Sequence, residues 1–146
     1  MHKLLIVSLL LLYCGCAGIE EFPLAATSGT VTCEGKPVAK AIVFFEPLPN
    51  TSSAVIGKQG YALTDENGKF VVSTYAENDG AVIGKHKVRV GSSETTPKCD
   101  CALLADIPLM EVEVKAGVAN TFELVLNKAT AADKLREQKQ KQKAED

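Results

Sequence analysis

The chain of 146 residues contains no tryptophan and only two histidines, and this scarcity limits its chemistry. His2 stands beside the N-terminus, so a catalytic site inside a folded domain would have to use His86. No G-x-S-x-G turn supplies a nucleophile for a triad, and no H-E-x-x-H pair supplies zinc ligands. The sequence therefore predicts no catalytic residues, no cofactor and no metal site, and we expect His86 to be a half-exposed strand residue.

No apolar run is long enough to cross a bilayer. The strongest one, residues 4–13, carries no charge but has only about half of the roughly 20 residues that a spanning helix needs. It follows Lys3 and leads into small residues, which is the layout of a bacterial export signal. We therefore expect this segment to be removed and leave it out of the fold.

The residues after that run resemble the lipobox of bacterial lipoproteins, in which a small residue precedes a cysteine that is lipid-modified after cleavage. Gly15-Cys16-Ala17-Gly18 fits the pattern, whereas Tyr13 and Cys14 depart from it. The resemblance implies a signal over residues 1–15 and a lipid on Cys16, which would anchor the exported protein to the cell membrane or outer membrane, on its periplasmic or surface side. Two alternatives stay open, namely Cys14 as the acceptor and ordinary secretion with cleavage near Ala17.

The part of the chain between residues 28 and 127 is expected to be all-β, because apolar and polar residues alternate over short windows and no longer window keeps a helical period. Residues 41–46 form a nearly continuous apolar run, typical of a strand at the centre of a sheet or buried on both faces. The expected strands are residues 30–33, 41–46, 61–64, 70–74, 86–90, 110–114 and 122–126.

Turn residues predict how some of these strands connect. Asn67-Gly68 predicts a tight hairpin between residues 61–64 and 70–74. A short loop over residues 115–120 predicts a second hairpin between the last two strands. Seven short strands at this spacing describe one small antiparallel sandwich, preceded by a tether over residues 16–27.

An ordered set of motifs gives the domain a family resemblance. The segments SGTVTCEGKPVAKAIVFFEP, ALTDENGKFVVST and DGAVIGKHKVRV resemble a carboxypeptidase regulatory-like or transthyretin-like domain, of the kind found in small lipoproteins of planctomycete-type bacteria. The resemblance covers roughly residues 28–127 and implies an Ig-like or transthyretin-like sandwich. The enzymes of transthyretin type that open hydroxyisourate carry several histidines and a C-terminal Tyr-Arg-Gly-Ser, which this chain does not have.

Three thiols lie within the expected domain, at Cys33, Cys99 and Cys101. In an exported protein a disulfide between Cys33 and one of the other two is favoured, and the sequence does not say which. The alternatives are free or mixed thiols and a soft-metal or thiol-redox site on Cys99 and Cys101. Asp65 and Asn67 partly resemble a calcium loop, but the ligand set is incomplete and a plain turn is favoured.

Charge separates the tail from the domain. Residues 128–146 carry six basic and four acidic side chains, whereas residues 16–127 carry nine and fourteen, so nothing suggests nucleic-acid binding. The tail contains helix formers after a Thr130/Asp133 start and is expected to be a frayed helix or disordered. We expect a non-catalytic, lipid-anchored binding or structural module of the cell envelope. It would contact an unidentified protein or surface through the loops at residues 48–60 and 92–108.

Overall fold

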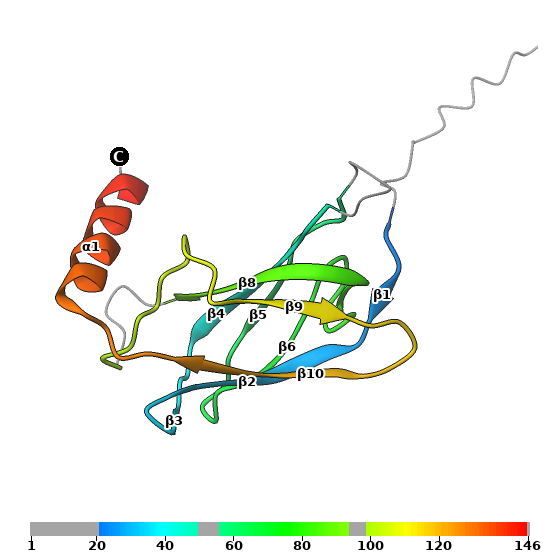
Figure 1. Ribbon diagram of the computed structural model, residues 1–146, viewed down its shortest axis with the longest axis horizontal. Helices are drawn as coiled ribbons and strands as arrows, with labels where there is room; N and C mark the ends of the chain where they lie inside the picture. The colour runs from blue at the N-terminus through cyan, green and yellow to red at the C-terminus, as the bar shows by residue number, and fades with distance from the viewer. Residues whose placement is uncertain (1–20, 50–55, 94–98, 146) are drawn as a thin grey trace, which may run out of the picture.

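The computed structural model describes residues 21–49, 56–93 and 99–145, and within them it is almost entirely β-structure with one helix (Figure 1). The expected export signal and Cys16 lie outside the described residues. The seven expected strands are all present, and three short ones were not foreseen. The elements are β1 (Leu24–Ala25), β2 (Thr27–Cys33), β3 (Lys36–Pro37), β4 (Ala41–Pro47), β5 (Gly60–Leu63), β6 (Lys69–Val71), β7 (Ala81–Val82), β8 (Gly84–Ser92), β9 (Met110–Val114), β10 (Asn120–Leu126) and α1 (Ala131–Glu145).

Two four-stranded sheets form the body of the protein. One has the order β5-β4-β8-β9, and the other contains β10, β2 and β3 with β6 also paired to β2. The apolar run 41–46 lies in β4 at the centre of the first sheet, as expected. Its residues alternate between buried and half-buried, so only one of its faces is fully enclosed.

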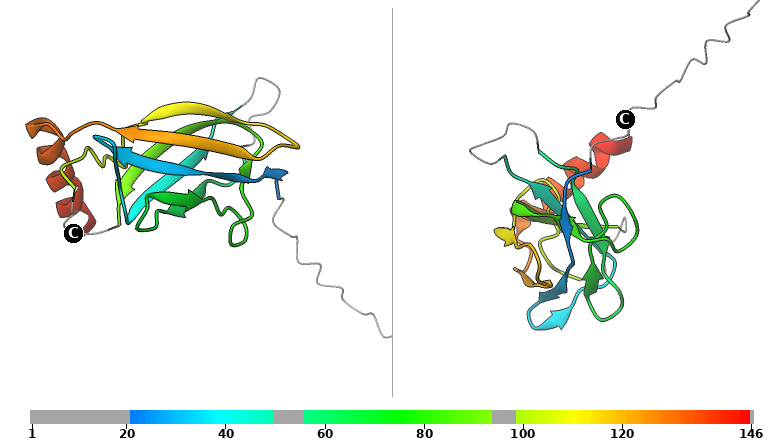
Figure 2. Two further views of the ribbon diagram at one scale, coloured as in Figure 1. Left: turned by 90° about the horizontal axis from the view of Figure 1, so that it is seen from below. Right: turned by 90° about the vertical axis from the view of Figure 1, so that its right-hand side faces the viewer.

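A shared apolar core joins the two sheets into a sandwich-like body (Figure 2). The fully buried Phe45 on β4 lies 6.2 Å from Phe70 on β6 and 5.8 Å from Phe122 on β10, measured between ring centroids. Val31 and Leu124 on the opposite sheet are also fully buried. Because one aromatic ring touches side chains of both sheets, burial of Phe45 stabilises their packing directly.

The predicted hairpin between the last two strands is wrong. Strand β9 pairs with β8 in one sheet, whereas β10 pairs with β2 in the other and runs parallel to it, so the sandwich is not wholly antiparallel. The buried Asn120 explains the crossing, because its Nδ2 donates to the carbonyls of Lys115, Val118 and Ala26. Its Oδ1 also accepts a hydrogen bond from the Lys115 amide. These bonds close the loop and attach it to the start of β2.

The Asn67-Gly68 turn forms, but its two arms separate. Gly68 has a φ of 71° and its amide donates to the carbonyl of Asp65, while β5 joins one sheet and β6 the other. Between the arms an isolated bridge connects Tyr61 to Ser73, and the Asp65 amide donates to the Lys69 carbonyl beside the turn. The expected tight hairpin is therefore a corner through which the chain passes from one sheet to the other.

The two ends of the described chain lie at opposite ends of the body (Figures 1 and 2). Residues 24–25, which were expected to belong to a tether, form strand β1 and pair with β7, and Thr27 at the start of β2 is buried. At the other end α1 begins as the sequence predicts. The amide of Asp133 donates to Thr130 Oγ1, and the amide of Thr130 donates to Asp133 Oδ2, which forms a reciprocal cap.

Candidate functional site

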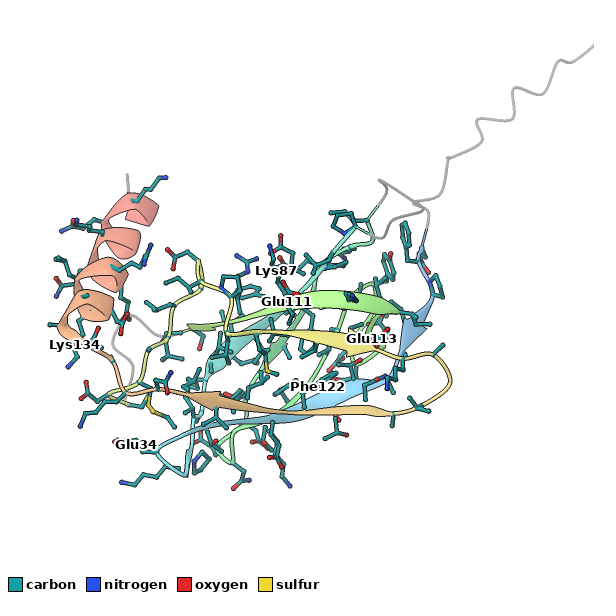
Figure 3. The ribbon with its side chains drawn as sticks, viewed as in Figure 1. Glu34, Lys87, Glu111, Glu113, Phe122 and Lys134 are labelled. Atoms are coloured by element: carbon teal, nitrogen blue, oxygen red, sulfur yellow. A yellow bond between two sulfur atoms is a disulfide. The ribbon has the colours of Figure 1, made fainter. Side chains whose placement is uncertain are left out.

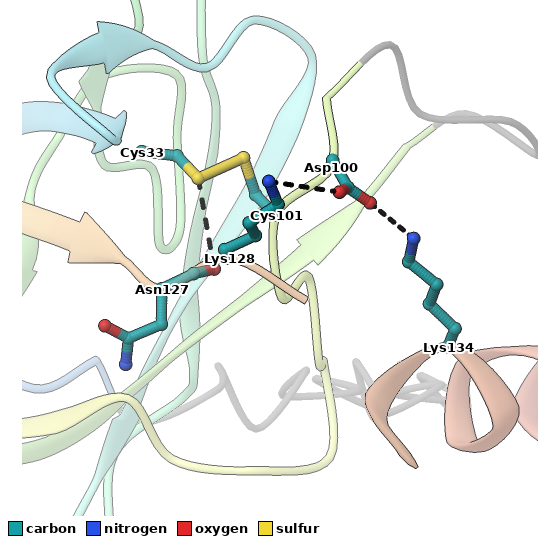
Figure 4. The surroundings of a disulfide bond; sticks show 6 residues. All are labelled: Cys33, Asp100, Cys101, Asn127, Lys128 and Lys134. Atoms are coloured by element: carbon teal, nitrogen blue, oxygen red, sulfur yellow. Dashed lines mark hydrogen bonds and ion pairs between the residues drawn. A yellow bond between two sulfur atoms is a disulfide. The ribbon is translucent and has the colours of Figure 1, made fainter. Parts of the chain in front are cut away.

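A disulfide joins Cys33 at the end of β2 to Cys101, whose Cα atom lies 6.3 Å away (Figure 4). This confirms one of the two pairings that the sequence left open. Both cysteines are buried, and Cys101 also makes a β-bridge with Lys128 just after β10. The bond therefore ties the segment after residue 99 to the ends of two neighbouring strands.

Cys99 remains a free thiol and is half-buried against the core. Burial raises its pKa above the ordinary value, against hydrogen bonds from the Cys101 and Cys99 amides that act to lower it. The thiolate, which is the nucleophile and metal ligand, is therefore disfavoured at neutral pH. In the oxidised protein Cys101 also has no thiolate to offer, so Cys99 and Cys101 do not form a pair of soft ligands.

Asp100, between these cysteines, connects the disulfide region to the helix (Figure 4). Its carboxylate lies 2.6 Å from Lys134 Nζ in the first turns of α1 and 3.9 Å from Lys128 Nζ. The hydrogen bond from Lys134 and the two positive charges lower the pKa of Asp100. These exposed ion pairs position the helix at this end of the body, and each contributes little stability by itself.

His86 is fully buried, so the expectation of a half-exposed residue is wrong. Its Nε2 lies 2.6 Å from the Val82 carbonyl oxygen and its ring packs edge-on to Phe45 at 5.8 Å. Desolvation lowers its pKa, although the carbonyls of Val82 and Phe45 partly oppose this effect. A neutral imidazole enclosed in this way is a core side chain, and a substrate has no access to it.

The carboxylate of Asp65 accepts hydrogen bonds within its own turn. Its Oδ1 accepts hydrogen bonds from the amides of Asn67 and Lys69, each at 2.8 Å. This arrangement explains the resemblance to a calcium loop, because Asp-x-Asn-Gly is also favourable turn chemistry. Within the described ranges 21–49, 56–93 and 99–145, no three His, Cys, Asp or Glu side chains converge as a metal site would require.

Opposite charges face one another across the outer surface of the sheet that contains β8. Lys87 lies between Glu46 on β4 and Glu111 on β9 in the strand register, and Lys85 is paired with Glu113 (Figure 3). Such cross-strand pairs each stabilise a sheet by about 0.2–1 kcal/mol. The ladder is a sheet-stabilising feature and leaves no single-sign patch for an anionic or cationic partner.

A wide hollow of about 890 Å³ opens where β5 and β6 separate, and we call it the corner hollow. Tyr61, Leu63 and Val71 line it, and their side chains are 55%, 58% and 48% exposed. Lys58, Lys69 and Glu77 provide charges around it. The sequence analysis missed this surface because it treated the two arms as one continuous hairpin.

A smaller groove of about 360 Å³ lies at the end of the body where the chain enters, and we call it the entry groove. Most of its lining residues are apolar, with Ile56 48% exposed, and two charged residues, Lys85 and Glu113, are among them. The apolar lining consists of Phe22, Pro47, Leu48, Pro49, Ile56, Val82 and Ile83. The sequence predicted a partner surface on the loop at residues 48–60, part of which lines this groove, but it did not predict the contribution of Phe22.

Asp79 orders a loop that lines the corner hollow and contacts Phe22 of the entry groove. Its two carboxylate oxygens accept hydrogen bonds from the amides of Thr74, Tyr75 and Ala76. Desolvation acts to raise the pKa of Asp79, but these bonds outweigh it and keep the pKa below its ordinary value. The ordered loop presents the Tyr75 hydroxyl, which accepts a hydrogen bond from the Phe22 amide at 2.9 Å.

Comparisons with known proteins add no relative, since no family profile, curated protein or solved structure matches the chain. Among the described residues, α1 is neither long enough nor apolar enough to cross a membrane.

Proposed function

We propose that the protein is a lipid-anchored, non-catalytic module of a bacterial cell envelope, exported and held at the membrane by an acyl group on Cys16. The observation that carries the proposal is the Cys33–Cys101 disulfide. Buried structural disulfides persist in oxidising compartments and are rare in the bacterial cytosol, which agrees with the export-signal layout before Cys16. A small exported domain also gains from a bond that closes a long loop.

We further infer that the body is an Ig-like or transthyretin-like sandwich of the carboxypeptidase regulatory-like kind. Two motif residues support this inference by their structural roles. Gly35, at a φ of 75°, follows Glu34 at 51° in the turn before β3, which suits the Gly-Lys-Pro motif. A side chain at Gly68 would meet the Val31 carbonyl, so the second motif turn packs against β2 and requires glycine.

The role we propose is contact with a protein or another envelope surface. Tyr61, Leu63 and Val71 in the corner hollow give an exposed apolar area that no other described element covers. Exposed apolar patches with polar rims are typical of interaction sites. A glycan platform is less suitable, because the chain has no tryptophan and sugar binding usually uses a flat aromatic ring.

Membrane fractionation tests the anchor. The unaltered protein should stay with membranes through high-salt and carbonate washes, because acyl chains bind by apolar burial. Cys16→Ser should release it or leave it uncleaved, whereas Cys14→Ser is the matched control and should change nothing. Release by Cys14→Ser alone would move the acceptor to Cys14, and washing out of the unaltered protein would refute the anchor.

A further inference from the structure

We propose that the entry groove is a membrane-docking surface, which lies on the polar interface of the same bilayer that holds the lipid on Cys16. The inference rests on the proposed lipid anchor and adds to it a fixed orientation of the domain. Its occupant is the lipid interface itself, with acyl-chain carbons near the groove and headgroup phosphates at its rim.

The length of the connecting chain limits how far the groove can lie from the anchor. Phe22 lines the groove and follows Cys16 by six residues. Six residues span at most about 20 Å when fully extended. The headgroup region of one leaflet is itself about 5–8 Å thick. An anchored Cys16 therefore keeps this end of the body close to the membrane surface whatever conformation the connecting residues adopt.

Hydrogen bonds fix the chain where it enters the body. The Phe22 amide donates to the Tyr75 hydroxyl, and the Ile83 amide donates to the Pro23 carbonyl at 3.0 Å. Leu24 then pairs with Val82 in the β1–β7 ladder. Because these bonds fix Phe22 to the domain, the groove and the point at which the chain enters the domain move together. Helix α1 lies at the opposite end of the body (Figure 1).

The side chains that line the groove suit a lipid interface. Ile56 is 48% exposed, and Phe22 and Leu48 are half-buried, so apolar atoms are presented at this end without a protein partner among the described residues. Lys85 is exposed at the edge of the groove and suits a lipid phosphate, although it faces Glu113 in the strand register. An aromatic and aliphatic surface beside a basic residue is the composition that interfacial segments use. Glu113 also lines the groove, so apolar contact, and not net charge, supplies the attraction.

The absence of tryptophan allows a direct test, because one introduced tryptophan is the only one in the protein. The full lipidated chain carrying Ile56→Trp is reconstituted in vesicles of phosphatidylethanolamine and phosphatidylglycerol, with and without brominated acyl chains. Leu135→Trp on α1 is the matched control, since Leu135 is 54% exposed and lies at the far end. We expect a blue-shifted emission and loss of fluorescence on brominated lipid for Ile56→Trp, and neither change for Leu135→Trp.

Three results would contradict the docking surface, and they differ in what they say about the anchor. Unquenched Ile56→Trp on protein that stays with the vesicles would overturn the docking surface and leave the anchor standing. Protein that washes off the vesicles in carbonate would overturn both. A blue shift that grows with protein density but shows no bromine quenching would mean that a second copy covers the groove.

Discussion

Removing the disulfide should cost a large part of the domain's stability. Cys33 and Cys101 are 68 residues apart in sequence. A crosslink closing a loop of this length lowers the entropy of the unfolded chain enough to stabilise the fold by about 4 kcal/mol at 25 °C, in the chain-entropy description. For a domain of about 100 residues, this corresponds to a fall in Tm of about 15–20 °C.

The variant that tests this estimate is Cys33→Ala/Cys101→Ala, measured as a lipid-free chain that begins at residue 17. Replacing both cysteines avoids leaving an unpaired buried thiol that could bond with Cys99. Circular dichroism followed against temperature and urea gives Tm and the free energy of unfolding. Cys99→Ala is the control and should change the free energy of unfolding by less than about 1 kcal/mol, because Cys99 is half-exposed and unbridged.

Two outcomes would refute the reasoning. If the double variant melts within about 2 °C of the unaltered protein, the disulfide does not provide the stabilisation that its loop length predicts. If Cys99→Ala destabilises the protein as much as the double variant does, Cys99 takes part in the crosslink in solution. Unaltered protein measured with a reductant should reproduce the double variant, which separates loss of the bond from loss of side-chain volume.

Three further predictions concern single residues. His86 has a pKa below its ordinary value of 6.5, so the unfolded chain binds a proton before the folded protein does as pH falls. The free energy of unfolding, measured by urea titration, should therefore decrease as pH falls below about 6.5. The variant His86→Phe should lose the part of this decrease that His86 causes. Gly68→Ala should destabilise the protein by about 3 kcal/mol and Gly117→Ala by about 1 kcal/mol. Both glycines have a φ of 71°, but only at Gly68 would the added Cβ meet a carbonyl oxygen, that of Val31, at 2.5 Å. Equal losses of stability in thermal melts would show that this contact is unimportant. Asn120→Ala leaves buried partners unpaired and should cost about 2–4 kcal/mol, whereas the exposed Asn127→Ala should be nearly neutral by the same urea measurement.

Local chemistry explains what could be predicted from the sequence. Strand β4 was expected from its apolar run, and the turns at Asp65–Lys69 and Thr130–Asp133 depend on side chains that bond to their own neighbours. The alternation of residues along β8 also indicates that His86 is buried, which the sequence analysis did not predict. His86 lies in phase with Val88 and Val90, and residues two apart in a strand face the same way, so its burial follows from theirs.

The sequence does not predict which strands or cysteines pair across long separations. Strands β10 and β2 pair in parallel although Asn120 and Thr27 are more than 90 residues apart, and no local pattern distinguishes this arrangement from a β9–β10 hairpin. The disulfide partner posed the same difficulty, since Cys99 and Cys101 differ by two positions. The entry groove and the corner hollow likewise arise from segments that only the folded chain brings together.

The most direct test of the lipid anchor is the intact mass of protein taken from the membrane fraction, before and after reduction and alkylation. The account predicts residues 16–146 plus acyl groups on Cys16, with one alkylated thiol before reduction and three after it. A lipid-free mass, or one that begins at another residue, would contradict the envelope anchor and with it the proposed orientation on the membrane.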